Sequence, residues 1–441
     1  MPNSFDLWGT LVIGRDPFTP DGDQPEGCHF PCAQTIAQVT PRDIVISDYY
    51  DPAKAERVLR NIAKLPNKLA VGNGIKADGS AFREHRPTHH TGDAPYEIEA
   101  AKKAGVKATL VQLSPFTPVE KQMYDAGLRG LALSMREGRL TTCDNTVGNR
   151  KLQLMQTQVN FPMLFLASVW LHRKAQREHL DKLLMCSRDA YLWSLLQARV
   201  RDLHAGDARV SPDVQLSPIS HPSAYDVEYF LSSRLTRYKT TPEYLAYANS
   251  RITPNTAIVD LCGGGESLRA FNNKLPSPVK MVLLIAYPHA KFGFGPGVDY
   301  AITWSGTDTC ELANLAQHAM IEDVTLVDGV AVPKYSNPRN VNWHLHPQIA
   351  TMHHAFRTCV SVMDNYDFST DLQISDGKLL EMLRLAYRQL EPYRADMNMF
   401  VHQFFYAEEQ NTQTLLSTRP KGHALSQSNF LPDHSDKRVK K

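Results

Sequence analysis

The sequence predicts an α/β protein of two domains, and three observations support this fold class. The chain has 441 residues, which exceeds the roughly 250–300 residues at which single hydrophobic cores stop growing. Short β-rich runs alternate with helical patterns over the first 115 residues, as they do in parallel β-α-β units. A second alternating pattern begins near residue 160, and a mostly helical C-terminal part follows it.

Composition places the chain among ordinary globular proteins. Apolar residues make up 42% and charged residues 21%, which excludes collagen-like and wholly disordered chains. The 48 basic and 46 acidic residues give a net charge of +2, so the total charge does not indicate a nucleic-acid partner. The longest apolar run, Phe161–Leu171, falls short of the ~18–20 residues that span a bilayer. We therefore expect no membrane span.

The N-terminus and the cysteines indicate a reducing, cytoplasmic setting. MPNSFDLWGTLVIGRD lacks the basic region and the small-residue cleavage site of a secretory signal. Seven cysteines are scattered along the chain, and an odd number at low density does not favour a disulfide framework. Cys28-His29-x-x-Cys32 is interpreted as a loop with two free thiols, because a zinc site needs four ligands and no second pair lies nearby.

The first domain, residues 1–115, is expected to contain five strands with helices between them. The predicted strands are Ser4–Phe5, Asp43–Ser47, Leu69–Gly72, Thr88–Thr91 and Ala108–Leu113. Pro52–Leu65 predicts a helix, because Pro stands in its first turn and apolar residues recur every three or four positions. Tyr96–Ala104 predicts another, with acidic residues at its start and Gly105 at its end.

Residues 116–159 are expected to form a helical linker, and residues 160–410 a second α/β domain. The predicted helices are Phe161–Lys174, Arg177–Lys182, Ala190–Val200, Tyr225–Tyr238 and Pro242–Ala248. The predicted strands are Leu183–Cys186, Ala257–Leu261 and Met281–Ala286. From about 310 to 410 we expect mostly helix, and the polar residues 411–441 are expected to form a flexible tail.

Candidate catalytic residues follow the predicted strands of the first domain. Asp6 ends the first strand, Ser47 the second and Asp93 the fourth, while Lys76 comes just after the third. Ligands of parallel α/β sheets bind outside the carboxyl ends of the strands, so we expect these side chains to share one edge. The alternative for Ser47 and Asp93 is a local role as caps of the helices that follow them.

The order of these motifs resembles the haloacid dehalogenase (HAD) superfamily of phosphatases and phosphotransferases. That family carries an Asp followed by x-Asp-Gly-Thr, then a Ser or Thr, then a Lys or Arg, and then an acidic Gly-Asp motif. This sequence has Asp6-Leu7-Trp8-Gly9-Thr10, Ser47, Lys76 and Gly92-Asp93 in the same order. The resemblance implies a HAD-like Rossmannoid domain around a parallel sheet.

The resemblance also implies a role for each matched residue. Asp6 would be the nucleophile that forms an aspartyl-phosphate. Ser47 would hydrogen-bond the phosphoryl oxygens, and Lys76 would neutralise charge on nucleophile and phosphate. The cofactor would be Mg²⁺, held by Asp6, by the backbone carbonyl of Trp8 and by Asp93.

This sequence departs from the family at two positions. Trp8 replaces the Asp that acts as general acid and base, so phosphoryl binding could survive while hydrolysis becomes slow. Dehalogenase members carry an aromatic residue there, which keeps a carbon–halogen or other displacement open as the reaction. Glu97 stands where the fourth motif commonly ends in Asp. Since 40 residues separate Asp6 from Ser47 and 28 separate Ser47 from Lys76, we expect no separate cap domain.

A candidate cofactor site in the second domain combines a strand, an Asp and a glycine-rich turn. Asp260 lies in the predicted strand AIVDL and precedes Gly263, Gly264 and Gly265. Glycines let the backbone approach an anion, and Asp260 at the strand end could hold a ribose hydroxyl or a metal. The alternative is that the glycines form a tight turn that packs the strand against the helix. Together with Ser187-Arg188-Asp189, the layout resembles HAD-like predicted hydrolases associated with glycosyltransferases.

These inferences predict a Mg²⁺-dependent, phosphatase-type enzyme. Its expected substrate is a phosphorylated sugar, nucleotide or polymer such as a glycan. Two alternatives stay open: a catalytically degenerate binding or scaffold protein, and a phosphoribosyl- or methyltransferase activity in the second domain. The histidines at Trp343–His346 and at His353-His354 are interpreted as surface or packed residues, because adjacent helical positions face different ways.

Overall fold

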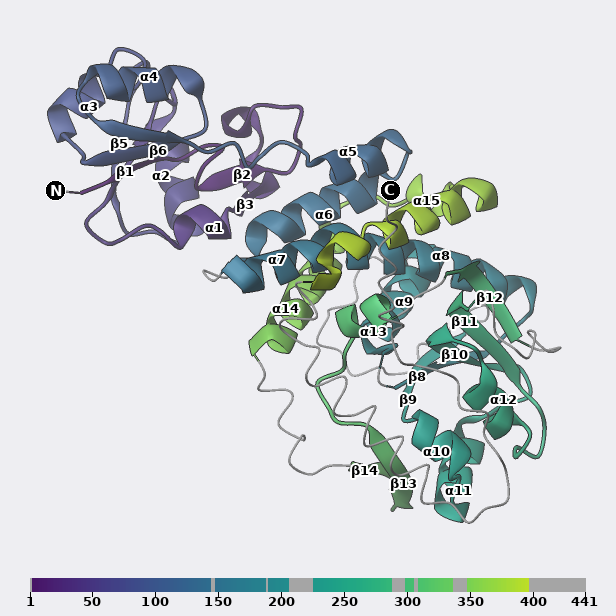
Figure 1. Cartoon of the computed structure of the whole chain (residues 1–441). Coiled ribbons are helices and arrows are strands. Elements are labelled where there is room, and N and C mark those ends of the chain that lie inside the picture. The colour runs from purple at the N-terminus through teal and green to yellow at the C-terminus, as the bar shows by residue number, and fades with distance from the viewer. Residues whose placement is uncertain are drawn as a thin grey trace, which may run out of the picture.

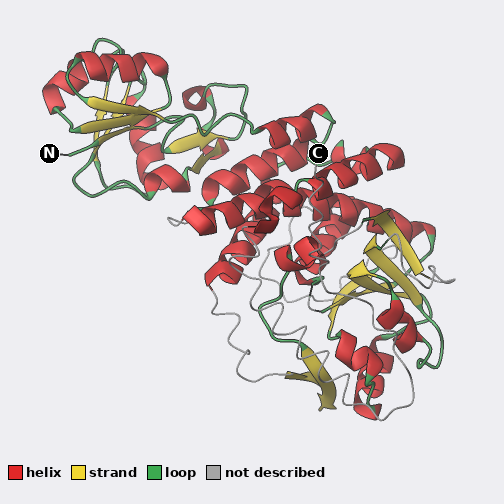
Figure 2. Cartoon of the chain, viewed as in Figure 1, coloured by secondary structure: helices red, strands yellow, loops and turns green. Residues whose placement is uncertain are grey.

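Two five-stranded parallel sheets organise the chain (Figures 1 and 2). The computed structural model describes residues 2–143, 147–187, 189–205, 225–287, 298–304, 308–335 and 347–395. The predicted α/β class is therefore confirmed. The predicted domain boundaries stay predictions, and the predicted tail, 411–441, lies outside the described residues.

The first sheet lies in what we call the N-terminal lobe, residues 2–110. In spatial order its strands are β5 (Lys68–Val71), β4 (Ile44–Ser47), β1 (Ser4–Asp6), β6 (His89–Gly92) and β7 (Lys107–Leu110). All neighbours run parallel, and Asp6 stands opposite Ile46 of β4. The chain builds β4 and β5 on one side of β1 before it crosses to β6. The topological switch point, where ligands of such sheets bind, is therefore between β1 and β6.

Helices cover both faces of this sheet because alternate strand residues point to opposite sides. Val45 packs with the helix α2 (Pro52–Asn61) on one face. Ile44 and Ile46 pack on the other face, against the helices α3 (Ser80–His85) and α4 (Pro95–Lys103). Figure 1 shows α3 and α4 side by side over the sheet.

A small antiparallel hairpin fills the gap between the first two candidate motifs. It pairs β2 (Val12–Gly14) with β3 (His29–Pro31). Short elements accompany it, namely η1 (Asp21–Asp23), η2 (Glu26–Cys28) and α1 (Ala33–Ile36). This hairpin was not predicted, because strands of three residues are too short to show a detectable alternation of polar and apolar residues.

A helical layer follows the N-terminal lobe, as predicted for residues 116–159. Its members are α5 (Pro118–Asp125), α6 (Arg129–Thr141), α7 (Val147–Met155), the π-helical turn η3 (Gln156–Asn160) and α8 (Phe161–Arg177). The apolar run in α8 lies in the largest core, packed against residues of the second sheet and the C-terminal helices. A helix that is apolar on nearly all sides is one that is buried on nearly all sides. Within the described ranges, no helix is long and apolar enough to cross a membrane.

The second sheet has the spatial order β12 (Val298–Thr303), β11 (Lys280–Ala286), β10 (Thr256–Gly263), β8 (Lys182–Cys186) and β9 (Asp226–Phe230). All neighbours run parallel. The surrounding helices are α9 (Tyr191–His204), α10 (Arg234–Tyr238), α11 (Pro242–Arg251) and α12 (Glu266–Asn272). The switch point of this sheet is between β8 and β10.

The remaining elements follow β12. They are α13 (Asp308–Ala313), the antiparallel strands β13 (Ile321–Val327) and β14 (Val330–Tyr335), α14 (Pro347–Val362) and α15 (Asp376–Arg388), with short 3₁₀ turns at Met363–Asn365, Asp371–Gln373 and Glu391–Tyr393. The prediction of mostly helix from residue 310 is wrong over β13 and β14. Asp328 and Gly329 both adopt positive φ, at 51° and 79°, which is the backbone of a tight hairpin turn.

Two predicted helices of the second domain are also wrong. Over Tyr225–Tyr238 the chain forms the strand β9 first, and α10 begins only after Ser233, whose hydroxyl accepts the Thr236 N–H as an N-cap. Over Arg177–Lys182 the chain leaves the helix, since α8 ends at Arg177 and His179 adopts a left-handed φ of 52°. A left-handed residue ends the run of helical hydrogen bonds.

Candidate active site

The predicted site residues of the N-terminal lobe meet at the carboxyl edge of its sheet. Asp6 ends the central strand β1, and Asp93 follows β6 across the switch point. One carboxylate oxygen each from Asp6, Asp93 and Glu97 can be chosen so that all three lie within 4.8 Å of one another. The sheet topology therefore gathers side chains that are up to 91 positions apart in the sequence.

Lys76 lies between two of these carboxylates. Its Nζ is 2.7 Å from Asp6 Oδ1 and also forms an ion pair with Glu97 Oε2. Lys76 is only 3% exposed, so its charge depends on these partners rather than on water. Burial alone would lower the pKa of Lys76, but Asp6 and Glu97 outweigh it and raise the pKa above its usual value. Lys76 is therefore a fixed positive charge beside Asp6.

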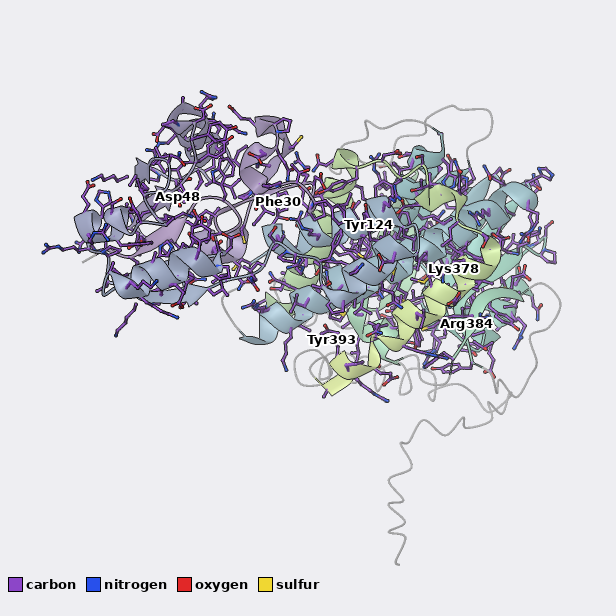
Figure 3. The ribbon with its side chains drawn as sticks, turned by 90° about the horizontal axis from the view of Figure 1, so that it is seen from above. Phe30, Asp48, Tyr124, Lys378, Arg384 and Tyr393 are labelled. Carbon is purple, nitrogen blue, oxygen red and sulfur yellow. The ribbon has the colours of Figure 1, made fainter. Side chains whose placement is uncertain are left out.

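The loop that carries Lys76 is held by Asp48. The two carboxylate oxygens of Asp48 accept the backbone N–H groups of Lys76 at 2.6 Å and of Ala77 at 3.3 Å. Asp48 belongs to the segment that leaves β4, next to Ser47, and Figure 3 shows it within the N-terminal lobe. This residue therefore acts on the position of Lys76 and does not cap the helix that follows, a role that Asp51 takes by accepting the Lys54 N–H.

Glu97 is held in place from three directions. Its Oε1 accepts the Ala94 N–H at 3.0 Å, as the third residue of α4. Its Oε2 meets Lys76 and lies 3.6 Å from His90 Nε2. His90 in turn contacts the Ser4 hydroxyl through Nδ1 at 3.0 Å. Burial would raise the pKa of Glu97, but His90 and Lys76 outweigh it and lower the pKa to about 2.

The other two carboxylates differ from Glu97 in their electrostatics. Burial raises the pKa of Asp6 well above its usual value, although Lys76 opposes the rise. Burial, followed by the charge of Glu97, raises the pKa of Asp93 to about 6. A bound cation relieves the repulsion among carboxylates that lie this close together. Three carboxylates are also the hard oxygen donors that Mg²⁺ prefers, so these residues fit such an ion.

Gly9 fits the site for two reasons. Its φ of +69° lies in the left-handed region, and a Cβ at this position would overlap the Asp93 carboxylate. Only glycine therefore lets the loop after β1 run against Asp93. The predicted motif Asp6-x-x-Gly9 thus has a steric reason as well as a sequence pattern.

Ser47 and Trp8, two further predicted residues, have contrasting surroundings. Ser47 is fully buried at the end of β4, and its Oγ accepts the Tyr49 N–H at 3.3 Å. The Trp8 ring lies 5.1 Å from the ring of His29 and 5.2 Å from that of Tyr49, and Lys54 Nζ lies 5.8 Å from its centroid. The position two residues after Asp6 therefore holds an indole inside an aromatic cluster.

Sequence patterns alone do not reveal the parts played by His90, Glu97 and Asp48. Glu97 was noted only as a departure from a motif, and its ion pair with Lys76 joins α4 to the loop after β5. His90 could have been found from strand alternation, since His89 is half-buried while His90 is fully buried next to the site. Asp48 directly follows Ser47, and no pattern in the sequence indicates its hydrogen bonds to the loop that carries Lys76.

The second candidate site has a different character. Asp260 Oδ2 accepts from Arg237 Nη1 at 2.7 Å, and Asp260 Oδ1 accepts the Leu261 N–H at 2.9 Å. Arg237 is 4% exposed and also donates to the hydroxyls of Ser232 and Ser267. Asp260 therefore serves as the charge partner of a buried arginine.

The backbone after β10 agrees with the alternative of a tight turn. Gly263 and Gly265 have φ values of 138° and 73°, and Gly264 stands between them before α12 begins at Glu266. The predicted cofactor role of Asp260 and these glycines stays a prediction. Arg188 lies outside the described residues.

The remaining candidate metal and thiol motifs have local explanations. All seven cysteines are free thiols. The His29 ring nitrogens contact the backbone oxygens of Asp21 and Glu26 at 2.6 and 3.1 Å. His353 is buried and contacts the Leu315 carbonyl, whereas His354 is exposed, so these two face different ways as predicted. The Trp343–His346 motif lies outside the described residues.

The candidate active site is thus defined by geometry, in which Asp6, Lys76, Asp93 and Glu97 share one edge of a parallel sheet. A match to a known family would give an independent assignment of their roles. No family model matches the chain, and no curated protein matches it either.

Proposed function

We propose that the N-terminal lobe carries a HAD-like phosphoryl-transfer site in which Asp6 is the nucleophile. The observation that supports this most directly is the buried Lys76 ammonium, 2.7 Å from Asp6 Oδ1. A lysine in this position favours the ionised form of Asp6 against the effect of burial, and it attracts a dianionic phosphoryl group to the carboxylate. The placement of both groups at the switch point of the sheet supports the same proposal.

The proposed reaction forms a bond between a carboxylate oxygen of Asp6 and phosphorus while the bond from phosphorus to the leaving oxygen breaks. The leaving oxygen departs with its electron pair. The indole of Trp8 is too weak an acid to protonate that oxygen, so leaving groups that are stable as anions, such as aryl or acyl oxygens, are favoured. Lys76 holds its charge against the attacking carboxylate throughout.

Asp6 and Asp93, together with the backbone carbonyl of Trp8, would hold Mg²⁺, which would neutralise charge on the phosphoryl oxygens. Glu97 has a different part in the proposal. Its carboxylate already meets Lys76, His90 and the Ala94 N–H. Glu97 therefore positions Lys76 rather than contacting the phosphoryl group.

An aryl-phosphate assay tests the proposal. Phosphate release from p-nitrophenyl phosphate is measured with and without Mg²⁺ for the wild type, Asp6→Asn and a control, Asp125→Asn. Asp125 is an exposed residue of α5 that pairs with Lys121. We expect Asp6→Asn to lose at least about a thousandfold of activity and the control to retain it. Equal release by the wild type and Asp6→Asn contradicts the proposal.

A second candidate function, phosphoryl binding without turnover, is favoured by the indole at Trp8. Without an acid and base the aspartyl-phosphate would form once and persist. Incubation with acetyl phosphate and Mg²⁺ separates the two functions. A stoichiometric mass gain of one phosphoryl group with no continued release indicates the binding function, whereas continued release indicates the enzyme. Asp6→Asn gains no mass in either case.

A further inference from the structure

A cavity of about 400 Å³ lies between α3, which follows the loop of Lys76, and α4, which carries Glu97. Its lining includes Ala77, Asp78, Arg83, Tyr96, Glu99 and Lys103. The first of these residues directly follows Lys76, and Tyr96 directly precedes Glu97. Each residue of the ion pair thus has its direct sequence neighbour in the lining, and the size of the cavity is typical of small-molecule sites.

Tyr96 offers an aromatic face at the boundary between cavity and site. It stands in the first turn of α4 and is 53% exposed. Burial raises the pKa of its phenol while the charge of Lys76 lowers it, which places Tyr96 within electrostatic reach of the site. An exposed aromatic face of this kind stacks readily on a planar ring.

Two cations, Arg83 and Lys103, line the cavity beyond Tyr96. Over the ranges that the structure covers, neither forms an ion pair; Arg83 donates to the Asp78 carbonyl at 3.0 Å. The acidic neighbours have other partners, since Asp78 accepts the Ser80 N–H and Glu99 pairs with Lys102. The lining therefore carries two acidic and two basic side chains, and the two basic groups have no ion-pair partner among the described residues, so they can bind an added anion.

We propose that this cavity takes the leaving group of the substrate, and that the leaving group is an aromatic ring with a second anionic group. This inference rests on the proposed function. The phosphoryl group faces Asp6, the ring stacks on Tyr96, and Arg83 and Lys103 hold the second anion. The chemistry agrees with Trp8: when the phosphorus–oxygen bond breaks, a phenolate leaves without a proton from the protein and is protonated by water.

Two pairs of probes test the inference and distinguish the source of the second anion. Phenyl phosphate is compared with 4-carboxyphenyl phosphate, and adenosine 5′-phosphate with adenosine 3′,5′-bisphosphate. In the wild type we expect kcat/KM for the carboxylated aryl ester to exceed that for phenyl phosphate about tenfold, mainly through KM, because it gains charge-assisted hydrogen bonds. We expect the nucleotide pair to react poorly, since an alkoxide leaves with difficulty without an acid.

Variants locate the preference in the cavity. Combining Arg83→Gln with Lys103→Gln is expected to bring the ratio between the two aryl esters to about one, whereas Lys102→Gln, an exposed neighbour paired with Glu99, keeps the ratio at about ten. Tyr96→Ala is expected to raise KM for both aryl esters, and Tyr96→Phe to preserve it, because the phenyl ring retains the stacking face.

The outcomes separate this inference from the proposed function. Turnover of both aryl esters with equal kcat/KM overturns the inference and leaves the function intact. A preference that survives the double variant also overturns it. No phosphate release and no phosphorylated Asp6 with any probe overturns the function and the inference together.

Discussion

Lys76 holds its ammonium group between Asp6 and Glu97 where almost no water reaches it. We predict that Lys76→Met lowers the free energy of unfolding by about 3–5 kcal/mol, because breaking a buried pair leaves uncompensated charge behind. The loss is measured by urea denaturation at neutral pH.

An exposed lysine provides the control for that variant. Lys121 pairs with Asp125 on the surface of α5, and such pairs contribute little. Lys121→Met is therefore expected to change the free energy of unfolding by less than about 1 kcal/mol. If the two variants lose the same stability, burial does not govern the Lys76 pair.

Gly9 and Gly74 separate the two costs of placing alanine at a left-handed position. Both have a positive φ, +69° and +75°, but only at Gly9 would a Cβ meet another group, the Asp93 carboxylate. We predict that Gly74→Ala lowers the free energy of unfolding by about 1–2 kcal/mol through backbone strain alone. Gly9→Ala is expected to lose more and to abolish phosphate release, as measured by urea denaturation and by the aryl-phosphate assay. Equal losses would show that the contact with Asp93 is not close.

The site residues could be predicted where their position depends on the end of a strand. Asp6, Ser47 and Asp93 each end or follow a strand, so a parallel sheet brings them to one edge. The ion pair between Lys76 and Glu97 was not predictable, because it depends on how the first turn of α4 is oriented over that edge. The packing of the helix on the sheet determines this orientation, and a local sequence pattern does not predict such packing.

At the scale of elements, the strands of the first sheet were predicted well and the strand β9 was missed. The first sheet has short apolar runs between clear helix patterns. Asp226–Phe230 instead alternates in polarity over five residues only, which favours a strand, but it was included in a longer predicted helix over Tyr225–Tyr238. Its pairing with β8, from Lys182 opposite Asp226 to Cys186 opposite Phe230, decides in favour of a strand. A partner 44 positions away in the sequence cannot be identified from a local window.

The helix α14 carries a titratable core residue next to an exposed one. His353 is 2% exposed, and its Nε2 lies 2.7 Å from the Leu315 carbonyl. Burial lowers the pKa of His353 to about 4, so the fold favours its neutral form. Since the unfolded chain binds the proton near pH 6.5, stability is full above that pH. It falls by on the order of 3 kcal/mol as the pH drops to about 4.

This pH dependence is measured from urea midpoints at pH 7, 6 and 5. His353→Gln keeps a side-chain donor for Leu315 and removes the titration, so its midpoint is expected to fall less with acid than that of the wild type. His354→Gln, on the exposed face, is expected to behave as the wild type does. An unchanged acid response in His353→Gln would refute this source of the pH dependence.

At the scale of the whole molecule, α6 joins the N-terminal lobe to the helical layer. Buried Arg136 donates to the carbonyls of Gly14 and Arg15 and to both oxygens of Ser114. Its guanidinium lies 5.7 Å from the centroid of the Phe30 ring, and Figure 3 shows Phe30 on the side of the lobe that faces the helices.

Glu137, the next residue of α6, extends the same connection. It accepts hydrogen bonds from Arg15 on one side and from Asn365 and Tyr366 on the other. The lobe and the C-terminal helices therefore share one carboxylate. Contacts between elements so distant in sequence could not be predicted without the structure.

We predict that Arg136→Met destabilises the protein by about 2–4 kcal/mol, because it leaves buried carbonyl groups without donors. Limited proteolysis is expected to cut the segment between β7 and α5 faster in this variant. Arg129→Met, an exposed position on the same helix, is the control and is expected to match the wild type. Equal cleavage of all three proteins would argue against a role for Arg136 in holding the lobe.

The uninterrupted span of the N-terminal lobe has a consequence for synthesis. All strands of its sheet lie between Ser4 and Leu110, whereas the largest core of the rest takes residues from Met123 to Leu390. A nascent chain leaving the ribosome can therefore complete the first sheet, with Asp6, Lys76 and Asp93 assembled, long before the second core has its C-terminal helices. Until α6 has been synthesised, the carbonyls of Gly14 and Arg15 lack the hydrogen bonds that Arg136 donates to them. A pause in translation before that helix would expose this surface to chaperones.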